Sequence, residues 1–202
     1  MDVMVDEATE DITKMAAMSP SETTYFDTSV AAHAKHRIAW LLILMFSSTI
    51  TGSIITKYKN AFAAIPLLVS FIPMLMDTGG NCGSQSSTLI IRGIALGEIR
   101  FSDLFRVMFK EFRVSLIVGV VLALANGLRI LIMYRNAGLA LVIGLSLVAT
   151  VIISKLIGCL LPLFAKKLHM DPAIMASPLI TTLVDTCSIL IYFNIATRIF
   201  QL

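Results

Sequence analysis

The stretch PMLMDTGGNCGSQSS, residues 73–87, places an aspartate, an asparagine, a glutamine and three glycines inside a strongly apolar region. The flanking runs AFAAIPLLVSFI and TLII are typical of a membrane-spanning segment. Ionisable residues are costly within a bilayer and, where they occur, mark pathways or binding sites. The stretch therefore predicts a membrane helix whose polar residues serve a function.

The composition of the whole chain agrees with a membrane environment. Of 202 residues, 57% are hydrophobic and 14% are charged, whereas soluble domains are typically about 25% charged. The net charge of +3 gives no indication of nucleic-acid binding. The partner expected for so apolar a chain is the lipid bilayer. Cys82, Cys159 and Cys187 lie apart in apolar stretches and are expected to be free, buried thiols. The chain is predicted to be a multi-pass protein of the cell (inner or plasma) membrane.

Five apolar runs have about the length needed to cross a hydrocarbon core, which takes about 20 helical residues. None of them alternates apolar and polar residues as the strands of a membrane barrel do. We therefore expect an all-α membrane protein, with a cytosolic polar tail over residues 1–35 and a five-helix transmembrane domain over residues 36–202. The expected spans are 37–56, 61–91, 114–133, 138–164 and 172–199.

The distribution of Lys and Arg gives the expected orientation. These residues are more numerous on the side of the membrane that holds the N-terminus, where Lys35, Arg37, Arg106 and Lys166 lie. Basic residues favour the cytoplasmic side of a membrane protein. The N-terminus is therefore expected in the cytoplasm and the C-terminus outside the cell.

The segment EIRFSDLFRVMFKEFR, residues 98–113, joins the second and third predicted spans. Its apolar residues fall on one helical face and are Phe101, Leu104, Phe105, Met108 and Phe112. This pattern predicts an amphipathic helix at the inner membrane surface, with Ser102 as its N-cap. A charged linker between the two spans is the simpler alternative.

Asp185 lies about a dozen residues into the fifth predicted span, roughly 18 Å deep at a rise of 1.5 Å per residue. An aspartate near the bilayer centre costs on the order of 2.5–3.5 kcal/mol on insertion scales. A role as a cation ligand that faces a wet cavity would explain why it is there. The structural alternatives are an ion pair with Lys155 of the fourth span, or a protonated carboxyl bonded to a neighbour.

A stripe of small polar residues runs along the fifth span at spacings of four, four and three residues. Residues at these spacings share one face of a helix. The stripe consists of Ser177, Thr181, Asp185 and Ser188. It suits a water-filled pore, although small residues also line ordinary contacts between membrane helices.

The second predicted span offers further oxygen ligands, in the part that is expected to reach the cytoplasmic mouth. Its polar residues are Asp77, Asn81 and Gln85, and its glycines are Gly79, Gly80 and Gly83. The glycines allow close backbone approach or a local break that exposes carbonyls, or they serve only tight packing. Oxygen donors without His or thiolate clusters suit a hard cation such as Mg²⁺ or Ca²⁺. The residues themselves therefore predict a cation pathway.

Two other classes of function compete with a simple pathway. A proton- or sodium-coupled divalent-cation exchanger would use Asp77 or Asp185 to load and unload protons. A membrane enzyme or an assembly subunit is disfavoured, because the sequence contains no recognisable nucleophile–base pair, P-loop or HExxH motif. We therefore expect a transporter or channel and not an enzyme.

Two stretches, GGNCGSQSSTLIIRGIALGEI (79–99) and PLITTLVDTCSILIYF (178–193), resemble the signature stretches of the MgtE family of magnesium transporters and channels. With EATEDITKMAAM and DTSVAAHAKHRIAWLLILMFSSTITG nearer the N-terminus, the likeness covers essentially the whole chain. The resemblance implies a homodimer of five-helix subunits, with a pore on the twofold axis lined by the second and fifth spans. It implies that Asp185 recognises hydrated Mg²⁺, with other divalent cations as further candidate substrates. The polar positions of the second span carry over onto Gly79, Gly80, Asn81 and Gln85.

Full-length members of that family carry a cytosolic helical domain and paired CBS domains. Residues 1–35 are too few to form either, and EATEDITKMAAM resembles the helix that connects the CBS domains to the pore. From the resemblance we expect a pore domain that lacks the cytosolic N and CBS domains, with separate regulatory domains as further partners.

Overall fold

The computed structural model describes residues 10–16, 18, 25–175 and 177–201, and these residues form α-helices joined by short turns and 3-10 helices. The prediction of an all-α protein with long apolar helices is confirmed. The principal elements are α2 (Val30–Lys57), α3 (Lys59–Ala64), η1 (Pro66–Phe71), α4 (Ile72–Ala95), η2 (Phe101–Asp103), α5 (Leu104–Tyr134), α6 (Ala137–Lys167), η3 (Pro172–Met175) and α7 (Ser177–Phe200).

Four helical segments in the described part of the chain are long and apolar enough to cross a membrane. They are Val30–Lys57, Phe101–Tyr134, Ala137–Lys167 and Pro172–Phe200. The second predicted span, residues 61–91, is absent from this set because its helices are interrupted and because α4 carries many polar residues.

The interruption of the second predicted span lies before its polar stretch. Pro66 begins η1 and Pro73 is the second residue of α4, where a residue without an N–H is tolerated because helix starts leave these donors unpaired. The carbonyl of Leu68 in η1 accepts a hydrogen bond of 2.8 Å from the buried hydroxyl of Tyr192 on α7. The expected alternative of a break at the glycines is wrong, since α4 is uninterrupted from Ile72 to Ala95.

The predicted amphipathic helix over residues 98–113 is not a separate element. Helix α5 begins at Leu104 and continues without a break to Tyr134, so most of this segment forms the first turns of the third predicted span. Ser102 is not an N-cap, because it lies inside η2 and the N-cap position of α5 is Asp103. The Asp103 carboxylate instead accepts a hydrogen bond of 3.0 Å from the backbone N–H of Arg100.

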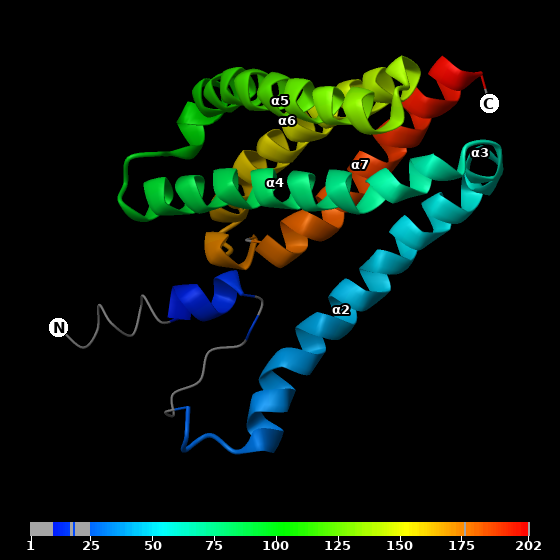
Figure 1. The fold of residues 1–202 in the computed structure, drawn as a ribbon. Coiled ribbons are helices and arrows are strands. Elements are labelled where there is room, and N and C mark those ends of the chain that lie inside the picture. Colours follow the sequence, from blue (N-terminus) through cyan, green and yellow to red (C-terminus); the bar gives the residue numbers. More distant parts are fainter. Residues whose placement is uncertain (1–9, 17, 19–24, 176, 202) are drawn as a thin grey trace.

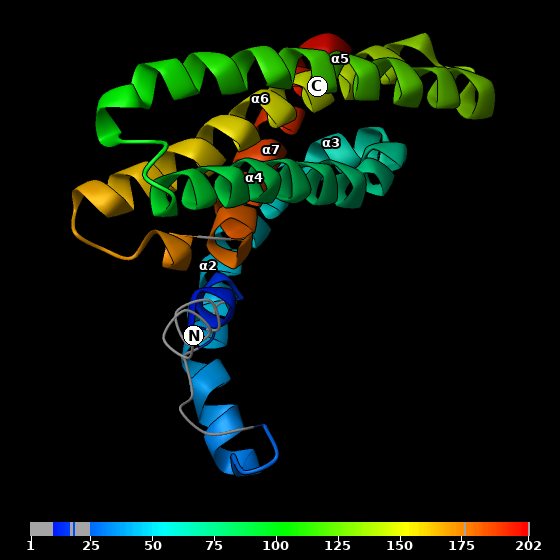
Figure 2. The same ribbon diagram turned by 90° about the vertical axis from the view of Figure 1, so that its left-hand side faces the viewer.

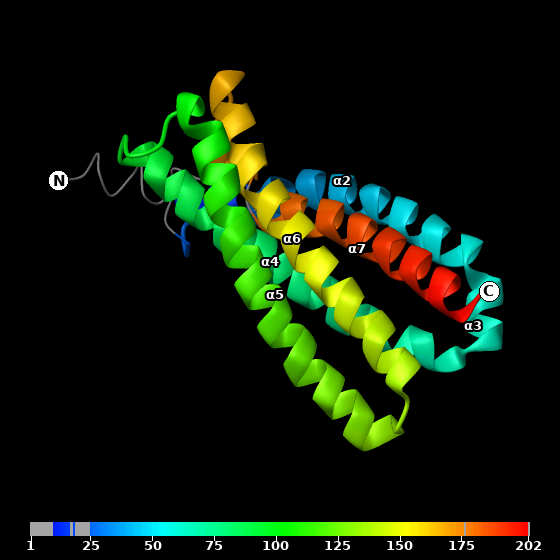
Figure 3. The ribbon, with the colours of Figure 1, turned by 90° about the horizontal axis from the view of Figure 1, so that it is seen from above.

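The helices form a bundle in which α6 is central. Helix α5 packs along one side of α6, while α4 and α7 pack against α6 and against each other. Figures 1 and 2 show α5 on one side of the bundle and α2 extending away on the other. Seen from above, α6 lies between α5 and α7 (Figure 3). This arrangement places α4 in contact with both α6 and α7, and the polar stretch therefore lies against two other long helices.

Helix α2 contacts the bundle through its C-terminal half. Its N-cap, Ser29, accepts a hydrogen bond of 3.2 Å from the N–H of Ala32, so the helix begins before the predicted start at Arg37. Thr51 is buried, and its hydroxyl lies 2.8 Å from that of Thr186 on α7. Phe46, near the middle of the helix, is 65% exposed. Much of the apolar surface of α2 is therefore uncovered by this chain.

Candidate functional site

Helix α4 presents its charged and amide side chains on one uncovered face. Asp77, Asn81 and Gln85 are all exposed, and their spacing of four residues places them on successive turns of the same face. The helix forms there because Pro73 starts it and because the rest of its surface is apolar or small enough to pack. The three side chains together offer a column of carboxylate and amide oxygens.

Gly79 and Gly80 of α4 lie on the face that packs against α7. A Cβ added to Gly79 would lie 2.7 Å from Cγ1 of Val184 and 3.0 Å from Oγ of Ser188. A Cβ added to Gly80 would overlap the side chain of Thr181. Within one chain, Gly79 and Gly80 are therefore buried in the contact between α4 and α7. The structure thus favours the tight-packing role considered for them.

Helix α4 approaches α6 even more closely. A Cβ added to Gly158 of α6 would overlap the carbonyl oxygen of Gly83 on α4. From the other side, a Cβ on Gly83 would lie 3.2 Å from the carbonyl oxygen of Ser154. Backbone meets backbone here, so a side chain at Gly158 could be accommodated only if the two helices moved apart.

The predicted stripe on α7 is divided between this contact and the uncovered side. Ser188 is buried beside Gly79, and Thr181 is partly buried, with its hydroxyl donating to the carbonyl of Pro178 at 3.0 Å. Asp185 is partly exposed. Ser177 is the first residue of α7, and its side chain lies outside what the structure describes.

Asp185 and Asp77 form the acidic part of the site. They lie close enough for their negative charges to repel each other. Within the part of the chain that the structure describes, neither forms a salt bridge. The alternative of an Asp185–Lys155 ion pair is wrong, because Lys155 is buried beside Glu111 instead. A cation from solution can therefore balance the charge of the two acids.

The donor set of one chain is too sparse to strip a metal ion of its water. Among the described residues there is no group of three or more His, Cys, Asp or Glu side chains that could hold a metal. Two carboxylates and two amides can instead hydrogen-bond to the water shell of a hydrated cation. The arrangement suits passage of an ion better than its permanent retention.

A second polar group was not singled out by the sequence. Ser86 of α4, Glu111 of α5 and Lys155 of α6 meet in the interior, with Ser86 donating to Oε2 of Glu111 at 2.6 Å. Glu111 lies in the segment that was predicted to be amphipathic, and Phe105 and Phe112 on its predicted apolar face are the exposed residues. Glu111 lies four residues from Val107 and from Ser115, and all three are buried on α5. This spacing places them on one face of the helix, and it could have indicated that Glu111 points inward.

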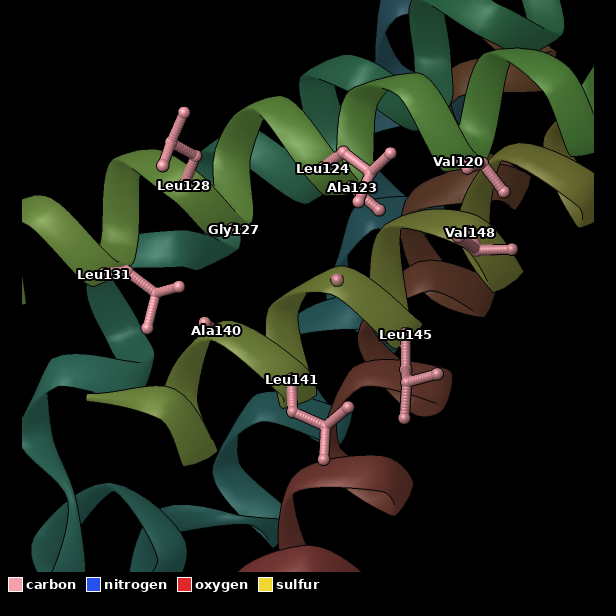
Figure 4. A pocket seen from close by; sticks show the side chains of 11 residues that line it. Val120, Ala123, Leu124, Gly127, Leu128, Leu131, Ala140, Leu141, Leu145 and Val148 are labelled. Carbon is pink, nitrogen blue, oxygen red and sulfur yellow. The ribbon is translucent and has the colours of Figure 1, made fainter. Parts of the chain in front are cut away.

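A cavity elsewhere in the described part of the chain has a different character. It is a groove of about 450 Å³ between α5 and α6, and its lining consists of apolar side chains and glycines, including Gly127 and Leu128 (Figure 4). No lining residue is charged or polar. A groove of this kind cannot stabilise a cation, so the candidate site is the polar surface of α4 and α7.

The comparisons with known proteins identify the family. The family model named MgtE, described as a divalent cation transporter, matches residues 72–195, which include Asp77 and Asp185. This chain belongs to the MgtE family. The chain is 40% identical over 197 residues to the magnesium transporter MgtE of Bacillus subtilis, and 36% identical over 203 residues to that of Thermus thermophilus. The matches cover 98% and 100% of this chain.

The chain spans less than half the length of these curated relatives, with 43% of the Bacillus protein and 44% of the Thermus protein covered. The resemblance to the MgtE family that the sequence indicated is confirmed. Membership of the family and the long apolar helices confirm the prediction of a multi-pass membrane protein.

Proposed function

We propose that this chain forms the membrane pathway through which Mg²⁺ crosses the cell membrane. The observation that carries the proposal is the pair of acids, Asp77 and Asp185, that lie near each other without a basic partner among the described residues. Membrane acids of this kind mark ion pathways. The printed name of each of the two relatives above is a magnesium transporter, which supports Mg²⁺ as the transported substrate.

Asp185 is the central site of the proposed pathway. Mg²⁺ loses its water reluctantly, so carboxylates in a pathway bind its water shell more readily than the bare ion. Asn81 and Gln85 extend the oxygen surface along α4, and Thr181 adds a hydroxyl on α7. Mn²⁺, Co²⁺ and Ca²⁺ carry the same charge and are the competing substrates to be tested.

The pathway is completed by a second copy of the chain. One copy leaves Asp77, Asn81 and Gln85 exposed, and polar groups that face hydrocarbon are unfavourable. A twofold pair would turn two such faces toward each other and would place two Asp185 carboxylates around one axis. The pore then lies on the twofold axis, lined by α4 and α7 from each subunit, with five membrane spans per subunit.

The N-terminus is proposed to lie in the cytoplasm and the C-terminus outside, in a cell membrane. Residues 1–35 then form a cytosolic tail, in which residues 10–15 form a short helix and residues 30–35 are the first turns of α2. This short helix is attached to the loop before η3 through Lys14, whose Nζ lies 2.6 Å from Oδ2 of Asp171. The attachment supports a connecting role, through which regulatory domains could act on the helix that carries Asp185.

A coupled exchanger is the second candidate. The specific observation in its favour is the proximity of Asp77 to Asp185, because two neighbouring carboxylates share protons more readily than separate ones. An exchanger would use these acids to carry a proton or Na⁺ in one direction and a divalent cation in the other.

Flux through the purified protein in liposomes tests the proposal. We expect Mg²⁺ entry down its own gradient, without an imposed proton or Na⁺ gradient, and loss of this entry in Asp185→Ala. Glu98→Gln, which removes an exposed acid in the loop after α4, is the matched control and should conduct normally. Flux that requires a proton or Na⁺ gradient would favour the exchanger. Normal Mg²⁺ flux through Asp185→Ala would eliminate the central site.

A further inference from the structure

Three buried polar side chains meet where α4, α5 and α6 pack together. Ser86 donates a hydrogen bond to Oε2 of Glu111 at 2.6 Å, and Nζ of Lys155 donates to Oγ of Ser86 at 3.2 Å. Nζ of Lys155 lies 3.9 Å from the same carboxylate oxygen. Ser86 is 0%, Lys155 5% and Glu111 8% exposed. We refer to these residues as the buried triad.

Stability alone is a poor explanation for the buried triad. Moving a carboxylate and an ammonium out of water costs about as much as their mutual attraction returns, and apolar residues of similar size often serve equally well. Buried ionic groups are better attested as devices that fix how elements pack against one another. The buried triad is therefore expected to fix the position of one of the helices that it joins.

The geometry points to α4. Ser86 is nine positions after Asp77, which at 100° per residue places it about 180° around the helix from that acid. It directly follows Gln85 in the sequence, so a rotation of α4 that moved Ser86 would also turn Gln85. The side of α4 that faces the proposed pathway is thus tied to α5 and α6 through the opposite side.

The glycine contacts of α4 limit its rotation by steric overlap, but they contain no hydrogen bond that selects one orientation. Against α6 they are close contacts of backbone with small groups. The neighbouring hydroxyls of Thr150 and Ser154 are buried and have no hydrogen-bond partner among the described residues. Such a surface holds α4 close to α6, and the buried triad adds the hydrogen bonds that would be lost if α4 turned.

We propose that Glu111 and Lys155 are positioning residues that, through Ser86, set the rotation of α4 and so the direction in which Asp77, Asn81 and Gln85 point. The triad contacts no transported ion; it acts on cation selectivity by aiming the oxygen column of α4. The expected effect on selectivity rests on the proposed function. The orientation of α4 can be measured without any flux.

The test uses the double variant Glu111→Leu/Lys155→Met, which replaces the pair by apolar side chains without leaving either charge unpaired. In liposomes we expect the ratio of Mg²⁺ to K⁺ flux to fall about tenfold, equivalent to about 1.4 kcal/mol of lost discrimination. The thermal unfolding midpoint should stay near that of the unsubstituted protein. Lys155→Arg, which keeps the charge and its hydrogen bonds, should retain the flux ratio.

A second readout follows the direction of α4 itself. Gln85→Cys is introduced alone and with the double variant, and its rate of modification by a charged, water-soluble thiol reagent is measured in the membrane. We expect the rate to change severalfold in the double variant, and also in Ser86→Ala, which cuts the link to α4 but leaves the ion pair. Ser115→Ala is the matched control, because Ser115 is buried on the same face of α5 and its hydroxyl donates to the carbonyl of Phe112 within its own helix.

These outcomes separate the two proposals. If the unsubstituted protein conducts no Mg²⁺, the proposed function fails, while the modification rates still test the position of α4. If a folded double variant keeps both the flux ratio and the rate of thiol modification at position 85, the positioning role is refuted. If the double variant does not fold and Ser86→Ala changes neither readout, the triad is only structural and the inference is equally refuted.

Discussion

Asp185 and Glu111 are both carboxylates within long apolar helices, but their surroundings differ in kind. Glu111 is buried, accepts a hydrogen bond from Ser86 and lies beside the Lys155 ammonium. Asp185 is partly exposed, has an acid as its charged neighbour and forms no salt bridge among the described residues. The charge of Glu111 is balanced inside the protein, whereas that of Asp185 must be balanced from solution.

This difference distinguishes an acid that bonds to neighbouring helices from an acid that, in the proposed pathway, meets an ion. A carboxylate with an internal partner has little left to offer a passing cation, since its charge and lone pairs are already used. One without a partner creates a negative potential where a cation is stabilised. Removing the first should therefore disturb the fold, and removing the second should disturb transport.

The largest expected effect is a loss of cation selectivity when Asp185 is substituted. Asp185→Asn keeps the size of the side chain and removes its charge, so we expect an open pathway with weakened preference for divalent over monovalent cations. The ratio of Mg²⁺ to K⁺ flux in liposomes should fall about 100-fold, the equivalent of about 2.7 kcal/mol. The thermal unfolding midpoint should not fall. An Asn variant that unfolds but keeps its selectivity would reverse the roles assigned to the two acids.

The next largest effect is a loss of stability when Lys155 is substituted. Lys155→Met leaves Glu111 buried without its cationic neighbour, which typically costs about 3–5 kcal/mol. We expect a strongly reduced yield of folded protein and a lower unfolding midpoint, measured by thermal denaturation in mild detergent. Adding Glu111→Leu should restore most of the loss, since no unpaired charge then remains. Equal stability of Lys155→Met and the unsubstituted protein would show that the pair is not energetically coupled.

A smaller effect is expected from Asp77. Asp77→Asn removes the like charge that lies near Asp185 but leaves the central carboxylate in place. Mg²⁺ flux should fall by roughly threefold to tenfold, corresponding to about 0.6–1.4 kcal/mol, without a change in oligomeric state. The measurement is the initial rate of Mg²⁺ entry at several concentrations. A loss as complete as that of Asp185→Ala would place the central site at Asp77 as well.

The smallest effect concerns an acid–base pair outside the membrane helices. Burial raises the pKa of Asp171, but the hydrogen bonds from Lys14 and from the N–H of Ala173 outweigh it, so this pKa lies below its ordinary value of 3.8. The same contact raises the pKa of Lys14. The stabilisation is therefore fully present above about pH 4 and is lost as the pH falls through the lowered pKa of Asp171.

Because both side chains are partly solvent-exposed, the contribution is about 0.5 kcal/mol or less. Asp171→Asn should lower the unfolding midpoint slightly at pH 7, and the difference from the unsubstituted protein should shrink toward pH 3. A difference that grows on acidification would contradict this account of the contact.

The sequence by itself was sufficient to predict the helical class and the family, and to single out Asp185 as the candidate site. Each of these depends on local information: the length of apolar runs, the spacing of polar residues and the order of two specific stretches. The column of Asp77, Asn81 and Gln85 could be predicted in the same way, because residues four apart share a face in any α-helix.

Only the tertiary structure decided which face meets which neighbour. Periodicity placed Phe101, Phe105 and Phe112 on one side, but it could not indicate that Phe105 and Phe112 are exposed while Glu111 is buried in the bundle. It also could not assign the partner of Lys155, which is Glu111 and Ser86 rather than Asp185. The physical reason is that a helix fixes the angular positions of its own side chains, whereas the contacts of those side chains depend on how distant segments pack.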